Sequence, residues 1–144
     1  MYQYRNELPE KYYLDHFNEF VHFITQQCTH LLDKEHQEFV KCYQQLAHET
    51  QCMFVRVINR QSGYINLNKM IYQEINDCTG QLLLLEKMGF LSVLSSNDID
   101  SWLQDLTKLQ LLDILNECDV TTVNKSSAKS VLLVQLIQSC TNAQ

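Results

Sequence analysis

The sequence predicts a mainly α-helical fold: a helical, winged-helix-like domain with a short β-hairpin, followed by a smaller helical module. Composition is the first reason, because the 144 residues include only one proline and three glycines, the residues that least favour helices. The second reason is that apolar residues recur every three or four positions along most of the chain. The third is the order of predicted elements, three helices, a strand, a helix and a returning strand, although other small α+β domains share that order.

The first two helices are predicted to form a hairpin. Apolar residues at 13–31 follow helical spacing and predict one long amphipathic helix. Asp33 is placed to cap the N-terminus of a second helix, and Glu35 lies near the positive end of that helix. The side chains expected to face inward from the second helix are Phe39, Tyr43 and Leu46.

A third helix is predicted at about 50–60, inside a stretch of the chain that has no carboxylate. Residues 52–72, CMFVRVINRQSGYINLNKMIY, contain Arg56, Arg60 and Lys69, although the whole chain has 17 Asp+Glu against 11 Lys+Arg. Because residues four apart share a helix face, Arg56 and Arg60 are expected to be neighbours. This window is the predicted contact for a polyanion; the alternative is that its three cations only solvate a surface.

The predicted β-hairpin has one strand at 64–67 and a returning strand at 91–94. Alternating apolar and polar residues in the first segment are typical of a strand. A helix at 79–88 lies between the two strands, and Gly89 is placed to take the left-handed conformation of a Schellman motif. Together the two strands would form the wing of a winged helix.

Residues 95–97, Ser-Ser-Asn, predict a boundary that divides the chain into a domain at 1–95 and a module at 96–144. In the module, Thr107 and Gln110 match a capping box that starts a helix. A polar loop separates this helix from a last helix at about 128–139. Two short helices cannot bury their apolar faces alone, so we expect them to pack together and on the first domain.

No catalytic motif is found in the sequence. Many metal-dependent nucleases use an Asp/Glu-x-Lys motif, in which carboxylates hold the metal and the lysine orients a water molecule. None of the eight lysines has a carboxylate two positions before it. The five histidines lack ligand spacing, and no glycine-rich phosphate loop is present. A binding module is therefore favoured over an enzyme, with no metal or cofactor expected in this segment.

The cysteines and the hydropathy indicate an intracellular protein. None of the six cysteines forms a Cys-x-x-Cys pair, and no signal sequence opens the chain. We therefore expect thiols in a reducing cytoplasm, or in the nucleoid region of a bacterium, with a disulfide framework as the alternative. The longest aliphatic run, at 82–85, is too short to span a bilayer, so no membrane partner is expected.

Four short segments carry a resemblance to a known family. They are KYYLDHF at 11–17, CMFVRVINR at 52–60, YQEI at 72–75 and GFL at 89–91. In order and spacing they resemble the amino-terminal DNA-binding region of the Fanconi-associated nuclease family. In that family a winged-helix-like region and a SAP module precede a helical-repeat domain and a VRR-NUC nuclease domain.

This resemblance implies that the chain is an amino-terminal piece of a longer DNA repair nuclease. The parent would cleave 5′-flap and other branched DNA with Mg²⁺ or Mn²⁺ and act in interstrand crosslink repair. The active site would lie in the nuclease domain, outside this chain, which explains the missing Asp/Glu-x-Lys motif. The helical-repeat and nuclease domains of the same polypeptide would be its protein partners.

The resemblance also implies a SAP-like helix-loop-helix at 96–144, with a lysine, here Lys129, opening the second helix. Two residues depart from the SAP pattern: Ser127 stands where glycine is usual, and Gln135 where arginine is common. Three carboxylates also make the module acidic, namely Asp113, Glu117 and Asp119. The fold tolerates such changes more easily than DNA affinity does. Lys125 and Lys129 are kept as predicted phosphate contacts.

Two hypotheses for the function follow. The first is a non-catalytic DNA-docking module that holds branched or flap DNA through phosphate contacts of Arg56, Arg60, Lys69, Lys125 and Lys129. The second is a protein-interaction or structural scaffold domain without direct DNA contact, which the acidic flanks of the chain favour. Arginines buried in ion pairs with carboxylates would weaken the DNA hypothesis. Tyr64 is either a stacking residue at an exposed DNA end or part of the wing core.

Overall fold

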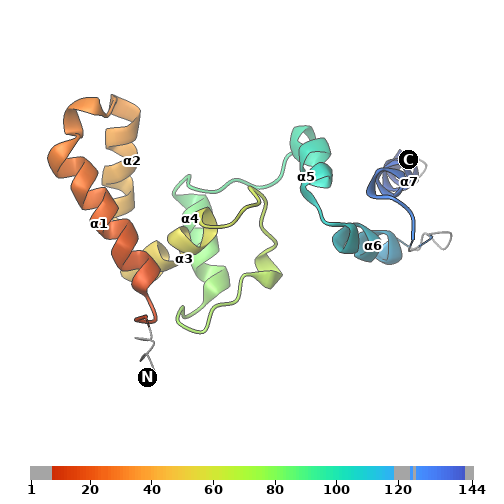
Figure 1. Cartoon of the computed structure of the whole chain (residues 1–144), viewed down its shortest axis with the longest axis horizontal. Coiled ribbons are helices and arrows are strands. Elements are labelled where there is room, and N and C mark those ends of the chain that lie inside the picture. Colours follow the sequence, from red (N-terminus) through yellow and green to blue (C-terminus); the bar gives the residue numbers. More distant parts are fainter. Residues whose placement is uncertain (1–7, 119–123, 125, 142–144) are drawn as a thin grey trace, which may run out of the picture. The chain divides into compact units, whose positions relative to one another are not determined.

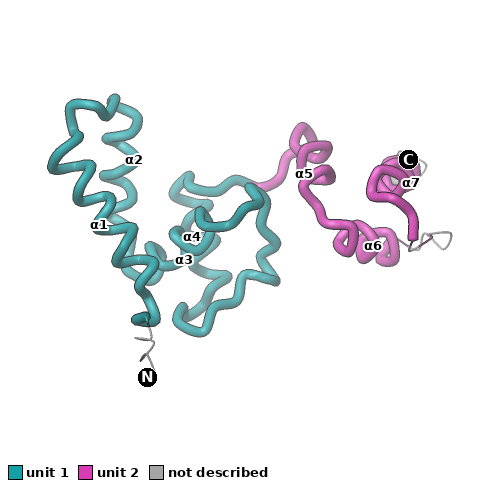
Figure 2. Tube along the Cα trace, in the orientation of Figure 1, with its two compact units in different colours: residues 1–92 teal, residues 93–144 magenta. Residues whose placement is uncertain are grey.

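The computed structural model describes residues 8–118, 124 and 126–141 of the chain. It divides into two compact units, unit 1 at residues 1–92 and unit 2 at residues 93–144 (Figures 1 and 2). The described part of unit 1 contains α1 (Tyr12–Gln27), η1 (Thr29–Leu31), α2 (Lys34–Gln44), α3 (His48–Ile58), η2 (Leu67–Lys69) and α4 (Cys78–Lys87). The described part of unit 2 contains η3 (Ser96–Asp98), α5 (Ile99–Asp105), α6 (Lys108–Glu117) and α7 (Lys129–Thr141). The prediction of a mainly helical fold is confirmed.

The helix ends follow their predicted capping residues. The Asp33 carboxylate accepts the His36 backbone N–H at 2.9 Å and so caps α2. At the end of α4, Gly89 has a φ of 83°, and the Phe90 N–H donates to the Leu85 carbonyl at 2.9 Å, as in a Schellman motif. The capping box predicted at the start of α6 is also present between Thr107 and Gln110. Local sequence therefore sets where these three helices begin or end.

Replacing Gly89 by alanine is expected to lower the free energy of unfolding by about 1–2 kcal/mol, because a Cβ atom disfavours the left-handed conformation. Steric contact would not contribute, since a Cβ atom there meets no atom within 4 Å. Urea denaturation of the variant measures the effect. Gly63→Ala is the matched control, because Gly63 also has open space around it but no positive φ. Equal losses in both variants would contradict this explanation.

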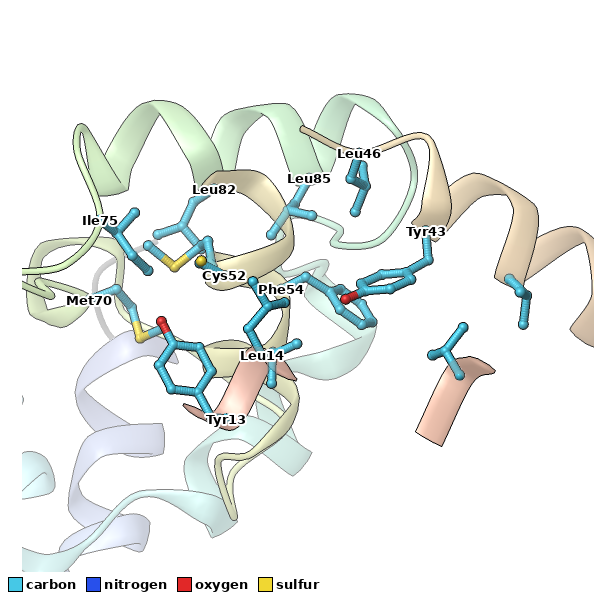
Figure 3. Close-up of a cluster of buried hydrophobic side chains, with 14 residues drawn as sticks. Tyr13, Leu14, Tyr43, Leu46, Cys52, Phe54, Met70, Ile75, Leu82 and Leu85 are labelled. Carbon is cyan, nitrogen blue, oxygen red and sulfur yellow. The ribbon is translucent and has the colours of Figure 1, made fainter. Parts of the chain in front are cut away.

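Helix α3 lies at the centre of the core of unit 1. Four consecutive residues, Cys52–Val55, are buried. Successive residues in a helix are about 100° apart, so four of them cover nearly the full circumference. Figure 3 shows Leu82 and Leu85 of α4 pointing toward α3, with the side chains of α1 and α2 on other sides of the cluster. Most of α3 is therefore enclosed, and only its ends face solvent.

The predicted β-hairpin is wrong. Both segments, 64–67 and 91–94, are described, and neither forms a strand; within the described residues of the chain all regular structure is helical. The Ser62 hydroxyl accepts the Tyr64 N–H at 3.1 Å and donates to the Tyr64 carbonyl at 3.0 Å. The Asn66 side chain likewise accepts the Asn68 N–H and begins η2. These local bonds satisfy the backbone groups that a strand partner would otherwise bind.

Some residues expected to be buried are exposed instead. Helix α1 ends at Gln27 rather than near residue 31, and Leu31 is exposed. The Thr29 hydroxyl donates to the Thr25 carbonyl, which is one of the last four carbonyls of the helix and has no partner inside it. Sequence periodicity gives the inward face of a helix but not its end.

Unit 2 has a core of its own. Its buried side chains come from α5, α6 and α7 and from the residue after α5: Leu103, Leu106, Leu111, Leu115, Leu132 and Leu136. The prediction that the last two helices pack together is confirmed. In the described parts of both units, no helix is long and apolar enough to cross a membrane.

Candidate nucleic-acid interface

The carboxylate-free window at 52–72 includes the buried half of α3 and most of the loop that follows. This loop, residues 59–77, connects α3 to α4 and carries Arg60 and Lys69. Arg60 follows the last turn of α3, and its backbone N–H donates to the Val57 carbonyl at 3.1 Å. Lys69 is the last residue of η2. Both side chains are exposed, and neither forms an ion pair with another described residue.

Arg56 lies in a different environment, because it is paired inside unit 1. Its Nε donates to Glu74 Oε1 at 2.8 Å, and its terminal NH2 group contacts the same oxygen. The Tyr13 hydroxyl also donates to this oxygen, at 3.0 Å. The Arg56 side chain is 32% exposed, whereas that of Glu74 is only 7% exposed. Arg56 and Glu74 thus form a largely enclosed ion pair, which is the arrangement that weakens a direct role of Arg56 on DNA.

Two aromatic rings flank the Arg56 guanidinium. Its Cζ atom lies 3.9 Å from the centroid of the Tyr13 ring and 4.8 Å from that of Tyr72. Both distances are within the range of a cation–π interaction. Tyr13 comes from α1, Arg56 from α3, and Tyr72 and Glu74 from the loop before α4. We call these four side chains the Arg56 cluster, because they join three segments that are distant in sequence.

The pKa values in the Arg56 cluster reflect burial opposed by hydrogen bonds. Burial raises the pKa of Glu74, but hydrogen bonds from its own backbone N–H, Arg56 and Tyr13 outweigh this effect and hold the pKa below its usual value. Burial, with the neighbouring Glu74 carboxylate, raises the pKa of the Tyr13 hydroxyl. Glu74 is therefore ionised and Tyr13 neutral at pH 7, which is the state that the observed hydrogen bonds require.

A second ion pair holds the same part of the loop. Lys11 Nζ donates to Glu49 Oε1 at 3.0 Å, and the Asn76 backbone N–H donates to Glu49 Oε2 at 2.9 Å. The Asn76 N–H and Lys11 together hold the pKa of Glu49 below its usual value. The beginning of α1, the first turn of α3 and the end of the loop are thus connected through one carboxylate.

In unit 2 only one of the two predicted lysines can be placed. Lys129 is the first residue of α7, and its Nζ donates to the Gln104 carbonyl at 2.5 Å. This bond uses one of its three donors within the unit. Lys125 lies outside the described residues. The carboxylates of Asp113 and Glu117 on α6 are exposed, so the described surface of this unit carries acidic groups as well as Lys108 and Lys129.

The remaining chemistry of the described residues is limited. No group of three or more His, Cys, Asp and Glu side chains among them is arranged to hold a metal ion. Tyr64 is half-buried. It is not part of a wing core, because residues 64–67 and 91–94 form no hairpin. Its neighbour Ile65 packs against the core of unit 1.

The sequence reasoning missed Tyr13, Tyr72 and Glu74 as partners of Arg56. A weak signal for them existed, since the segments KYYLDHF, CMFVRVINR and YQEI each place a charged residue close to aromatic or apolar ones. These are three of the four segments that carry the family resemblance, and the structure brings them together in the Arg56 cluster. Charge alone predicts that Arg56 lies at the surface.

The family model for the helix-turn-helix (HTH) domain of FAN1 matches residues 11–92, more than half of the chain. Unit 1 is thus a helical domain of the helix-turn-helix class, and only residues 45–47 connect α2 to α3. The chain belongs to the Fanconi-associated nuclease family. The second helix of the α2–α3 pair is enclosed by the core, so it does not offer a long side to a DNA groove.

Two curated relatives agree with this assignment. The chain is 26% identical over 125 residues to the Fanconi-associated nuclease 1 homolog of Arabidopsis thaliana, a match that covers 85% of this chain and 14% of that protein. It is 30% identical over 97 residues to Fanconi-associated nuclease 1 of Ailuropoda melanoleuca, covering 67% of this chain and 9% of that protein. The chain thus spans a small part of the length of these relatives. No solved structure matches it significantly.

Proposed function

We propose that this chain is a non-catalytic DNA-docking module, which holds branched or flap DNA by its phosphate backbone for a nuclease domain in the same polypeptide. The observation that carries the proposal is the pair of exposed, unpaired cations on loop 59–77, Arg60 and Lys69. No carboxylate lies between them in the sequence. Membership of a nuclease family supports it.

Phosphate contacts would make this binding depend on salt rather than on base sequence. Each duplex phosphate neutralised by a cation contributes a slope of about −0.9 in log K against log salt concentration. Backbone contacts also suit the recognition of DNA shape at a junction. Cleavage of interstrand-crosslinked DNA with Mg²⁺ or Mn²⁺ would belong to a VRR-NUC domain outside this chain, and a SAP-like unit 2 would add a contact through Lys129.

The double variant Arg60→Ala/Lys69→Ala is expected to bind a 5′-flap duplex more weakly than the wild type, with a salt slope smaller by about 1.8 for two lost contacts. Fluorescence anisotropy at several salt concentrations measures both quantities. Lys34→Ala/Lys41→Ala is the matched control, because it removes two exposed cations of α2 from the same unit. Equal weakening by both double variants would indicate non-specific attraction and would contradict a docking loop.

The alternative is a protein-interaction or structural scaffold domain without direct DNA contact. The observation in its favour is the internal pairing of Arg56, which removes one of the three cations of the window from the surface. The same experiment separates the two functions. Negligible binding by the wild type and by both double variants would support the scaffold and overturn the docking proposal.

A further inference from the structure

The connection at 59–77 is unusually long for a loop that carries binding residues on a compact unit. Connections beyond about 12–15 residues without regular structure are uncommon and usually serve a function or act as linkers. Here the only regular structure described is the single turn η2. If such a loop were free to move, its cations would lose conformational freedom on binding DNA, and the affinity would fall. The contacts that anchor loop 59–77 to the rest of unit 1 therefore affect its DNA affinity.

The second half of this loop is fastened to α1 and α3. Met70 and Ile75 are buried in the core of unit 1 and anchor it by packing. Between them, Glu74 Oε1 accepts hydrogen bonds from Arg56 of α3 and Tyr13 of α1. One residue beyond Ile75, the backbone N–H of Asn76 donates to the Glu49 carboxylate. Apolar and polar anchors thus alternate along the chain.

Arg56 holds the loop at two points. Its guanidinium donates to Glu74 and also lies against the ring of Tyr72, which belongs to the same turn of the chain. The opposing ring, Tyr13, fixes the guanidinium from α1. A planar guanidinium can stack and donate through two nitrogens at once, whereas a lysine ammonium is a flexible point charge. The Arg56 cluster is therefore specific for arginine.

We propose that Arg56 and Glu74 are positioning residues, which anchor the second half of loop 59–77 to α1 and α3 and so hold Lys69, at the start of that half, in place for the phosphate backbone of DNA. Arg60 is placed by the end of α3. This inference rests on the proposed docking function. Positioning and simple electrostatics predict opposite effects of removing Glu74 on DNA binding. Glu74 carries a negative charge within loop 59–77, so charge alone predicts that removing this charge strengthens DNA binding. Positioning predicts that its removal weakens binding.

Two conservative variants test this inference: Glu74→Gln, which removes the charge but keeps the shape, and Arg56→Lys, which keeps the charge but loses the planar group. Each is expected to bind the 5′-flap duplex about three- to tenfold more weakly, since a loosened loop is competent for only part of the time. The salt slope should remain that of the wild type, because the phosphate contacts are unchanged. Glu86→Gln, at an exposed carboxylate of α4, is the control for charge and should not weaken binding.

Tighter binding by Glu74→Gln would show that the charge of Glu74, and not positioning, controls the affinity. Unchanged affinity in both variants would show no positioning, and either result overturns the inference. Hydrogen–deuterium exchange provides an independent readout. We expect faster exchange at loop amides in both variants, with α3 and α4 unchanged. If circular dichroism shows that Glu74→Gln does not fold, the DNA affinity and loop exchange of Arg56→Lys test the inference. Absent binding by the wild type contradicts the proposed function, whereas unchanged loop exchange contradicts the fastening itself.

Discussion

Replacing Phe54 by alanine is expected to lower the free energy of unfolding of unit 1 by about 3–5 kcal/mol, the range typical of truncating a buried aromatic residue. Phe54 is buried at the centre of α3. Its ring lies 5.2–5.9 Å, centroid to centroid, from the rings of Phe17, Tyr43, Phe39 and Phe90. These rings come from α1, α2 and the segment after α4, so one truncation removes contacts of three segments with α3.

The two units can be followed separately during urea denaturation. All seven tyrosines lie in residues 1–92, whereas the single tryptophan, Trp102, lies in unit 2. Phe54→Ala should therefore shift the transition seen by tyrosine circular dichroism and leave the transition seen by Trp102 fluorescence in place. Phe23→Ala, at a residue of α1 that is 57% exposed, is the control and should change stability by no more than about 0.5 kcal/mol. Similar losses in the two variants would contradict the central position of Phe54.

The elements of this fold that depend on local sequence were predictable. Helix capping by Asp33 and Thr107 requires only residues three positions apart, and the Schellman motif at Gly89 requires one glycine and its neighbours. The β-hairpin depended instead on pairing between segments about 25 residues apart. Short side chains at 62 and 66 bind the backbone nearby, and sequence alternation does not reveal this competition.

The candidate interface was predictable only in part, for the same reason. The lack of carboxylates in 52–72 predicts Arg60 and Lys69 as surface cations, and both are exposed. The pairing of Arg56 with Glu74 joins residues that are 18 positions apart and lie in different elements. Helical spacing predicts Arg56 and Arg60 on one flank of a helix, but α3 ends at Ile58, so Arg60 lies beyond it and only Arg56 is paired within the fold. A charge pattern thus identifies cations but does not show which of them form ion pairs inside the folded unit.

Replacing Arg56 by alanine is expected to destabilise unit 1 by about 2–3 kcal/mol. Removing one partner of a buried ion pair leaves an uncompensated charge and costs about 3–5 kcal/mol. The value expected here lies below that range, because the Arg56 side chain is 32% exposed, although Glu74 is only 7% exposed. The double variant Arg56→Ala/Glu74→Ala should lose less than the sum of the two single variants, since neither charge is then left unpaired. Additive losses in urea denaturation would contradict the ion pair.

The pH dependence of this loss provides a further test. In the wild type the folded-state pKa of Glu74 is below its usual value of 4.5, so its stabilising effect is complete above that value and is lost as pH falls through the folded-state pKa. In Arg56→Ala the hydrogen bonds and the positive charge of Arg56 are gone, while the Glu74 backbone N–H and Tyr13 remain, so the pKa of Glu74 is higher than in the wild type. Protonation relieves the buried charge, so the stability difference between wild type and Arg56→Ala should shrink as pH falls from 7 toward 4. A difference that stays constant over this range would mean that the ionised carboxylate of Glu74 is not the cause of the loss.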